Sequence, residues 1–278
     1  MLKIKVSAKK VLVLVGVICL FLQYLLWLAP ESALAIYTFD IGQGDSLLIK
    51  TQDNKYILVD GGFDEKALAQ LQQVIPFWQR DLDLVILTHP DQDHVGGLPL
   101  VLDYYEVKNV IYTPVEHENG AYYQLQDIVQ GRQIPHHKLR DQADFQIGCC
   151  TYFDVLWPQQ ETELEKFQKD VNDTSFAFVL MVGEFSMFFG GDLGAKYEEL
   201  IFAENKYDLN VLKVGHHGST SSTSPRVLEL TNPEYAVIPV GKDNKFNHPT
   251  GEVLQNLQDS GVRIFRTDRD GRVEIVLD

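Results

Sequence analysis

Short apolar runs alternate with polar turns along most of the chain, and the turns are rich in glycine and aspartate. The runs are dominated by Val, Ile, Leu and Phe, which is typical of buried strands. We expect strands at residues 36–40, 46–51, 55–60, 83–87, 107–112, 152–156, 176–182, 211–214, 235–240, 262–266 and 273–277, and one that ends at residue 189. The remaining pattern predicts helices at residues 65–75, 121–130, 195–204 and 251–258. This alternation predicts an α/β protein, and two sheets with helices on their outer faces would accommodate it.

An apolar segment at residues 11–29, about 19 residues long, is sufficient to span a bilayer. Four lysines precede it and Glu31 follows it. We therefore expect a single-pass membrane protein with its N-terminus inside and its body extracytoplasmic. Secretion after cleavage near Ala35 is the alternative. The chain then divides into residues 1–30, an anchor or signal segment, and residues 34–278, a single domain of sufficient size for its own core.

The net charge is −15, from 24 basic and 39 acidic residues. The acidic excess lies in residues 31–210. A protein that clamps long duplex nucleic acid usually shows a basic footprint, which this chain lacks overall. Basic residues gather instead around the last histidines, where they either meet a phosphate or lie as solvated surface charges: Lys213, Lys242, Lys245, Arg266, Arg269 and Arg272.

Residues 88–97, directly after an expected buried strand, contain the highest density of potential metal-binding and catalytic side chains. Two imidazoles and two carboxylates fall within six positions there, His89 to His94. In α/β folds, sites commonly form at the C-terminal ends of core strands. If this run is extended, His89, Asp91 and Asp93 point one way and His94 the other, so the run could serve two neighbouring metal ions.

Further glycine turns with acidic or histidine residues close other apolar strands. They are Phe39–Asp45, Ile57–Gly62, Phe188–Gly194, Val211–Ser219 and Phe246–Pro249. Asp192 follows two glycines, which let backbone approach an ion closely, so its carboxylate could bridge two metals. Asp45 and Asp60 either orient the histidines from behind or cap their own turns.

These motifs resemble the metallo-β-lactamase fold and, more narrowly, the C-terminal hydrolase-like domain of ComEC-type competence proteins. The residues that carry the resemblance are Asp40-Ile41-Gly42-Gln43-Gly44-Asp45, His89-Pro90-Asp91-Gln92-Asp93-His94, Asn172-Asp173-Thr174-Ser175, Gly191-Asp192, His216-His217-Gly218-Ser219 and Asn247-His248-Pro249. The resemblance covers residues 34 to the C-terminus and implies an αββα sandwich. The wider superfamily has histidine where this chain has Asp91, and commonly a histidine where it has Asn172-Asp173. The first metal position is therefore poorer in nitrogen donors than usual.

The resemblance implies two divalent ions, Zn²⁺ or Mn²⁺, with oxygen donors favouring manganese at the first position. His89, Asp91 and Asp192 would hold one ion. The other would be held by Asp93, His94, Asp192 and His216, with Asp192 as the bridge. The catalytic groups would be Asp93, His217 and His248, and His217 or His248 would act as general acid or bind phosphate. Spacing alone does not distinguish His216 from His217 as the ligand.

The combined interpretation is a membrane-anchored, two-metal hydrolase of phosphodiesters, with nucleic acid as the leading candidate substrate. A phosphoester hydrolase of a cell-envelope polymer is the second hypothesis, and a catalytically idle metal- or ligand-binding domain is the third. Residues 113–150 show little pattern. His117 lies there without an assigned role, the His136-His137 pair is expected at the surface, and Cys149-Cys150 are expected to be packing residues.

Overall fold

The computed structural model describes residues 8–27, 33–113, 115, 117–137, 143–158 and 170–277. The chain divides into two units, Met1–Ser32 and Ala33–Asp278. In the first unit, α1 (Ala8–Trp27) is a 20-residue helix. Within the described stretches, no helix has both the length and the apolar character needed to cross a membrane. The predicted transmembrane helix, and with it the single-pass extracytoplasmic placement, is therefore not supported; residues 28 and 29 of the predicted segment lie outside the described residues.

In the described part of the second unit, two seven-stranded sheets form the centre of the domain. The first sheet has the order β16 (Val273–Leu277), β1 (Leu34–Thr38), β2 (Leu47–Lys50), β3 (Tyr56–Val59), β5 (Leu84–Leu87), β7 (Val110–Tyr112) and β8 (His136–His137). The second has the order β15 (Arg263–Arg266), β14 (Tyr235–Ile238), β13 (Val211–Lys213), β12 (Phe185–Phe189), β11 (Ala177–Val182), β10 (Thr151–Trp157) and β9 (Phe145–Ile147). A small sheet joins β4 (Asp81–Leu82) and β6 (Glu106–Val107).

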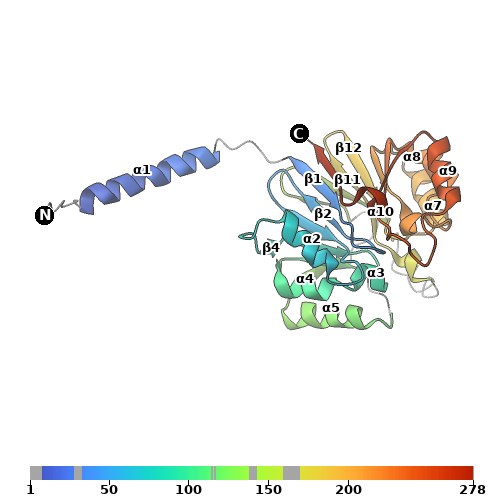
Figure 1. The fold of residues 1–278 in the computed structure, drawn as a ribbon, viewed down its shortest axis with the longest axis horizontal. Helices are drawn as coiled ribbons and strands as arrows, with labels where there is room; N and C mark the ends of the chain where they lie inside the picture. The colour runs from blue at the N-terminus through green and yellow to red at the C-terminus, as the bar shows by residue number, and fades with distance from the viewer. Residues whose placement is uncertain are drawn as a thin grey trace. The chain divides into compact units, whose positions relative to one another are not determined.

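Helices cover the outer faces of both sheets, as Figure 1 shows. Those on the first sheet are α2 (Lys66–Val74), α3 (Gln92–Val95), α4 (Leu98–Tyr104) and α5 (Gly120–Gly131). Those on the second are α7 (Ala195–Glu204), α8 (Pro225–Thr231) and α9 (Gly251–Asp259), and a single turn, α10 (Thr267–Asp270), follows β15. The αββα sandwich predicted from the sequence is confirmed.

Three apolar layers hold the sandwich together. Ile36 of β1 and Phe178 of β11 belong to the layer between the two sheets. Leu71 of α2 packs in the layer under the first set of helices, and Phe202 of α7 packs under the second. Strands β3 and β5 are buried along their whole length, which explains why they appear in the sequence as continuous apolar runs rather than alternating ones.

Most predicted elements are found close to their expected bounds, and four short helices of the described residues were missed: α3, α4, α8 and α10. Two of them, α4 and α8, have proline in the first turn, where a helix does not need the backbone N–H. His136 and His137 are exposed on the edge strand β8, as expected. Cys149 and Cys150 are also exposed, in the turn before β10, so their predicted packing role is wrong: a tight surface turn has no interior to fill.

Candidate metal centre

Strands of both sheets deliver acidic and histidine side chains to one edge of the sandwich. In the first sheet β3 and β5 are parallel, and Asp60 and His89 follow them. In the second sheet β12 and β13 are parallel, and Asp192 and His217 follow those. Parallel neighbours end at the same edge, so side chains far apart in sequence meet there.

The run from His89 to His94 is not extended throughout, and the sequence-based expectation of opposite directions is wrong. Asp91 is extended, but the next four residues form the helical turn α3. This turn brings His94 back beside His89, with ring centroids 4.0 Å apart. Both imidazoles therefore face the same group of carboxylates.

Four side chains form what we call the inner donor cluster: Asp93, His94, Asp192 and His217. His217 Nε2 lies 3.3 Å from Asp93 Oδ2 and 3.4 Å from Asp192 Oδ2. His94 Nε2 lies 3.4 Å from the same Asp192 oxygen. Ligands bonded at ~2.0–2.1 Å to a tetrahedral ion lie about 3.4 Å apart, so these distances fit one ion at the centre of the cluster.

The imidazole nitrogens that face the carboxylates have no hydrogen-bond partner. Among the described residues, Nε2 of His89, His94 and His217 are buried without a hydrogen bond. Buried polar atoms are normally paired, so a concentration of unpaired ones on neighbouring side chains needs an explanation. Three imidazole nitrogens and carboxylate oxygens are the donors that Zn²⁺ and Mn²⁺ accept, so the residues fit the metal centre that the sequence predicts.

The opposite nitrogens of the two inner histidines are held by protein groups. Asp60 Oδ2 lies 2.8 Å from His94 Nδ1, and Thr88 donates from its backbone N–H and its hydroxyl to the two Asp60 oxygens, each at 2.8 Å. His217 Nδ1 lies 2.9 Å from the carbonyl oxygen of Pro239. Such partners fix the ring orientation and the tautomer, so Asp60 orients a histidine and does more than cap its own turn.

Asp45 also contacts an inner histidine, on the Nδ1 side of its ring. Its carboxylate pairs with the buried ammonium of Lys213, and its Oδ1 lies 3.2 Å from His217 Nδ1. Lys213 also donates to the carbonyl of Gly191, at 2.6 Å, next to Asp192. Neither alternative suggested for Lys213, a phosphate contact or a solvated surface charge, agrees with the structure, because its ammonium is buried against Asp45 and Asp192.

The buried charges of the inner cluster depend on one another. Burial opposes ionisation of Asp192, but His217, His94 and Lys213 outweigh it and hold the pKa of Asp192 well below its usual range. Burial also opposes protonation of His217, yet Asp192 and Asp45 raise its pKa to about 10. A divalent ion would take over this balancing role and release the imidazole protons.

His89 and Asp91, together with the shared Asp192, form what we call the outer donor cluster. His89 Nδ1 lies 3.1 Å from the Thr88 hydroxyl and 3.4 Å from the Ser175 hydroxyl, so its Nε2 faces the carboxylates. That Nε2 lies 3.8 Å from Asp91 Oδ2. Burial, helped by the neighbouring His94, holds the pKa of His89 well below its usual range, so the ring is neutral and able to bind a metal.

His216 and His217 are adjacent in sequence, but a left-handed turn at these two residues directs their side chains to different places. Both residues have positive φ, 45° and 54°, in the short 3₁₀ segment Gly215–Gly218 after β13. The turn buries His217 in the inner cluster and leaves the His216 side chain 29% exposed, with its Nε2 3.8 Å from Asp192 Oδ2. The Ser221 hydroxyl lies 3.0 Å from His216 Nδ1. The structure thus places His217 closer to the other donors than His216, which was the predicted ligand.

His248 lies beside His216 rather than inside the cluster. Their ring centroids are 5.7 Å apart. Asn244 holds the loop, because its side chain bonds the backbone of Gly241, Phe246 and His248. Partial burial, together with His216 and His217, lowers the pKa of His248, which leaves a neutral imidazole at the rim.

Sequence reasoning gave no role to Thr88 or Ser175. Thr88 supports Asp60 and His89, and the Ser175 hydroxyl accepts from the backbone N–H of Asp192 at 3.1 Å. A signal for Lys213 was present in the sequence: a lysine that ends a buried strand requires an acidic partner inside the protein. The hydroxyl contacts of Thr88 and Ser175 have no comparable signal in the sequence, so they could not be predicted from it.

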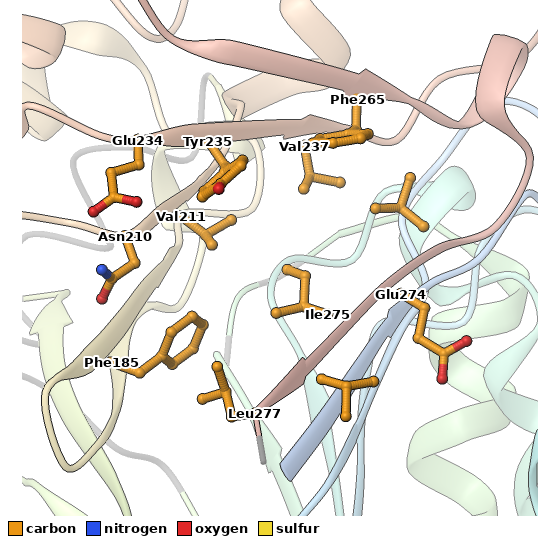
Figure 2. A pocket seen from close by; sticks show the side chains of 12 residues that line it. Phe185, Asn210, Val211, Glu234, Tyr235, Val237, Phe265, Glu274, Ile275 and Leu277 are labelled. Atoms are coloured by element: carbon orange, nitrogen blue, oxygen red, sulfur yellow. The ribbon is translucent and has the colours of Figure 1, made fainter. Parts of the chain in front are cut away.

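An apolar cavity lies elsewhere in the domain (Figure 2). Edge strand β16 lines one side with Ile275 and Leu277, and the other side carries Phe185, Tyr235 and Phe265. None of the donor residues lines it. The candidate metal centre therefore lies away from this cavity.

Residues 39–242 match the family model described as the metallo-beta-lactamase superfamily. The chain belongs to this superfamily. It is 29% identical to ComE operon protein 3 of Bacillus subtilis (strain 168), covering 95% of this chain and 36% of that protein. It is also 29% identical to competence protein ComA of Neisseria gonorrhoeae, covering 92% and 34%. The chain thus spans about a third of the length of these relatives, and the ComEC-type resemblance is confirmed.

Solved structures with low sequence identity share this fold. The diiron beta-hydroxylase CmlA from Streptomyces venezuelae is 15% identical, with a TM-score of 0.60 over 90% of this chain and 55% of that one. A likeness at this identity shows the fold alone. Membership of the superfamily indicates a metal-dependent hydrolase. Two groups of mutually close donor atoms agree with divalent metal binding: Asp45, His94 and His217, and His89, His94 and Asp192.

Proposed function

We propose that this protein is a two-metal phosphodiesterase with a nuclease-type activity. The observation that carries the proposal is the set of unpartnered imidazole nitrogens directed at shared carboxylates. Two divalent ions, when bound, would supply an acidified water and stabilise the negative charge of phosphate oxygens.

In this proposal the inner ion is held by Asp93, His94, Asp192 and His217. This exchanges the roles that the sequence suggested for His216 and His217. The support is geometric: His217 Nε2 lies within 3.4 Å of two carboxylates, whereas His216 Nε2 lies 3.8 Å from one. The outer ion would be held by His89 and Asp91, and Asp192 would serve both ions. Two nitrogen and two oxygen donors at the inner position suit Zn²⁺ or Mn²⁺.

The rim residues act on the substrate. His216 and His248 stand next to the inner cluster without being enclosed by it. We assign His248, the neutral imidazole, to binding the phosphate and His216 to delivering a proton to the departing oxygen. A positioned imidazole typically contributes about 10²–10⁴-fold to such a step. Asp93 would be a ligand of the inner ion and would orient the attacking water.

Nucleic acid is the proposed substrate class, because one of the similar curated proteins is named as a competence protein. The net charge of −15 argues against a long duplex wrapped on the surface. We therefore propose that contacts are limited to the few nucleotides around the scissile phosphodiester. An assay that compares short single strands with long duplexes distinguishes contacts to a few nucleotides from binding along a whole duplex.

The test uses the full chain, stripped of metal by chelation and restored with Mn²⁺ or Zn²⁺. Its substrates are bis-p-nitrophenyl phosphate, single- and double-stranded DNA and RNA, with Asp192→Asn as the matched control. Turnover that appears only with metal and only with Asp192 supports the proposal. Metal binding without turnover of any phosphodiester would support an idle domain instead.

A further inference from the structure

His117 faces the outer donor cluster from a loop that precedes α5. Its Nε2 lies 3.3 Å from Asp91 Oδ1, and the other oxygen of the same carboxylate lies 3.8 Å from His89 Nε2. One carboxylate is thus faced by two imidazole nitrogens from different parts of the chain. The His117 distance is close to the ~3.4 Å expected for neighbouring donors on a shared ion, and the His89 distance is longer.

The loop is fixed in place by Asn119. Its side-chain oxygen accepts from the backbone N–H groups of Ala121 and Tyr122 and caps α5. Its side-chain nitrogen donates to Gln92 Oε1 at 3.3 Å, which ties the loop to the residue after Asp91. The backbone N–H of Asn119 donates to the carbonyl of His117 at 3.0 Å. These bonds hold the backbone of His117 beside Asp91.

We propose that His117 is a ligand of the outer metal ion. It would supply the nitrogen that is missing because this chain has Asp91 where other superfamily members carry histidine. The outer ion then has His89, Asp91, His117 and the shared Asp192, two nitrogen and two oxygen donors, like the inner ion. This inference rests on the two-metal site of the proposed function.

A surface ion pair between His117 and Asp91 is the competing explanation. Such a surface ion pair contributes little to stability, and it does not involve His89. The buried, unpartnered Nε2 of His89 on the other side of the same carboxylate favours a shared ion. His117 is 30% exposed and Asp91 34%, so the outer ion would remain accessible from solution.

The experiment measures metal binding rather than activity. The full chain is stripped of metal, dialysed against a series of Mn²⁺ concentrations and analysed for bound manganese, and electron paramagnetic resonance detects coupled Mn²⁺ pairs. We expect His117→Ala to keep the first equivalent and to bind the second at least about 10-fold more weakly, since even loss of an outer partner costs about 10- to 100-fold. The coupled-pair signal should disappear at the concentration that saturates the wild type.

His136→Ala is the matched control, because His136 is exposed on β8 and its ring stacks on Tyr112 instead. His117→Asp, which keeps a donor atom, should recover part of the second site. Equal binding by His117→Ala and the wild type overturns the inference while the two-metal proposal stands. A second equivalent lost in Asn172→Ala and not in His117→Ala would also overturn it. A wild type that never binds two ions removes both the inference and the two-metal site.

Discussion

The inner and outer donor clusters share Asp192 but are built differently. The inner histidines, His94 and His217, are fully enclosed, and their outward nitrogens are held by Asp60 and Pro239. The outer cluster has one enclosed histidine, His89, and an Asp91 carboxylate that is 34% exposed. A donor set fixed by strand ends and supporting groups is preorganised for its ion. We therefore expect tight binding at the inner position and weaker, exchangeable binding at the outer position.

The largest effect should come from the residue that the two clusters share. Asp192→Ala should lose both ions and all metal-dependent hydrolysis, because its carboxylate faces His94 and His217 and lies within reach of His89. Elemental analysis after reconstitution measures this directly. A fully loaded Asp192→Ala protein would break the idea of a shared ligand.

The second test compares the adjacent histidines. His217→Ala should lose the inner ion, whereas His216→Ala should keep both ions and lose turnover, by about 10²–10⁴-fold if it handles the proton or the phosphate. Metal content and turnover are measured on the same samples. If His216→Ala is the variant that loses metal, the assignment from the turn geometry is wrong.

Much of this site was predictable from the sequence, because acids and histidines follow buried strands. The motif of residues 89–94 and the Gly-Gly-Asp turn with Asp192 follow from strand patterns and glycine turns, and the sandwich follows from the family resemblance that these motifs carry. The choice between His216 and His217 did not follow, since it depends on two consecutive left-handed residues. Local spacing carries no information about such a turn.

Long-range contacts were the other obstacle. The burial of Lys213 against Asp45 joins residues from different sheets, and a sequence scan treats each as an isolated charge. The direction of His94 depends on α3, a single helical turn too short to produce a periodic signal. His117 lies in a loop whose position is set by Asn119 and Gln92 rather than by its own neighbours.

A smaller effect is expected from the group behind the inner histidine. Asp60→Asn should weaken the inner ion by about 10- to 100-fold and leave the outer ion nearly unchanged, because an amide orients His94 less well than a carboxylate. Competitive titration with a chromophoric chelator gives the affinity. Thr51→Val, a substitution far from both clusters, provides the control for general destabilisation. An unchanged inner affinity would mean that Asp60 has no orienting role.

The smallest effect concerns stability and pH. Glu198 is buried behind the two turns that carry Asp192 and His217, and it accepts from the backbone N–H of Thr223 at 2.6 Å. Burial raises its pKa to about 7 from the ordinary value of 4.5. The folded state therefore favours the protonated acid. Its stability contribution is complete below pH 4.5 and is lost as the pH rises to about 7.

Glu198→Gln should remove this pH dependence. The wild type should lose up to about 1 kcal/mol of unfolding free energy per pH unit between pH 5 and 7 from this group, and the variant should not. Urea unfolding at a series of pH values, in the presence of a chelator, gives the slope of unfolding free energy against pH for both proteins. Parallel slopes for the two proteins would show that Glu198 is ionised, or solvated, in the folded state.

The most direct test of the two-cluster account is anomalous X-ray diffraction from crystals of the full chain grown with Mn²⁺. The account predicts two peaks, with Asp192 between them. The inner peak should contact Nε2 of His94 and His217 and should persist at low Mn²⁺, where the outer peak fades. A single peak on the Nδ1 side of these rings, against Asp45, would contradict the account, and so would crystals in which the outer position fills first.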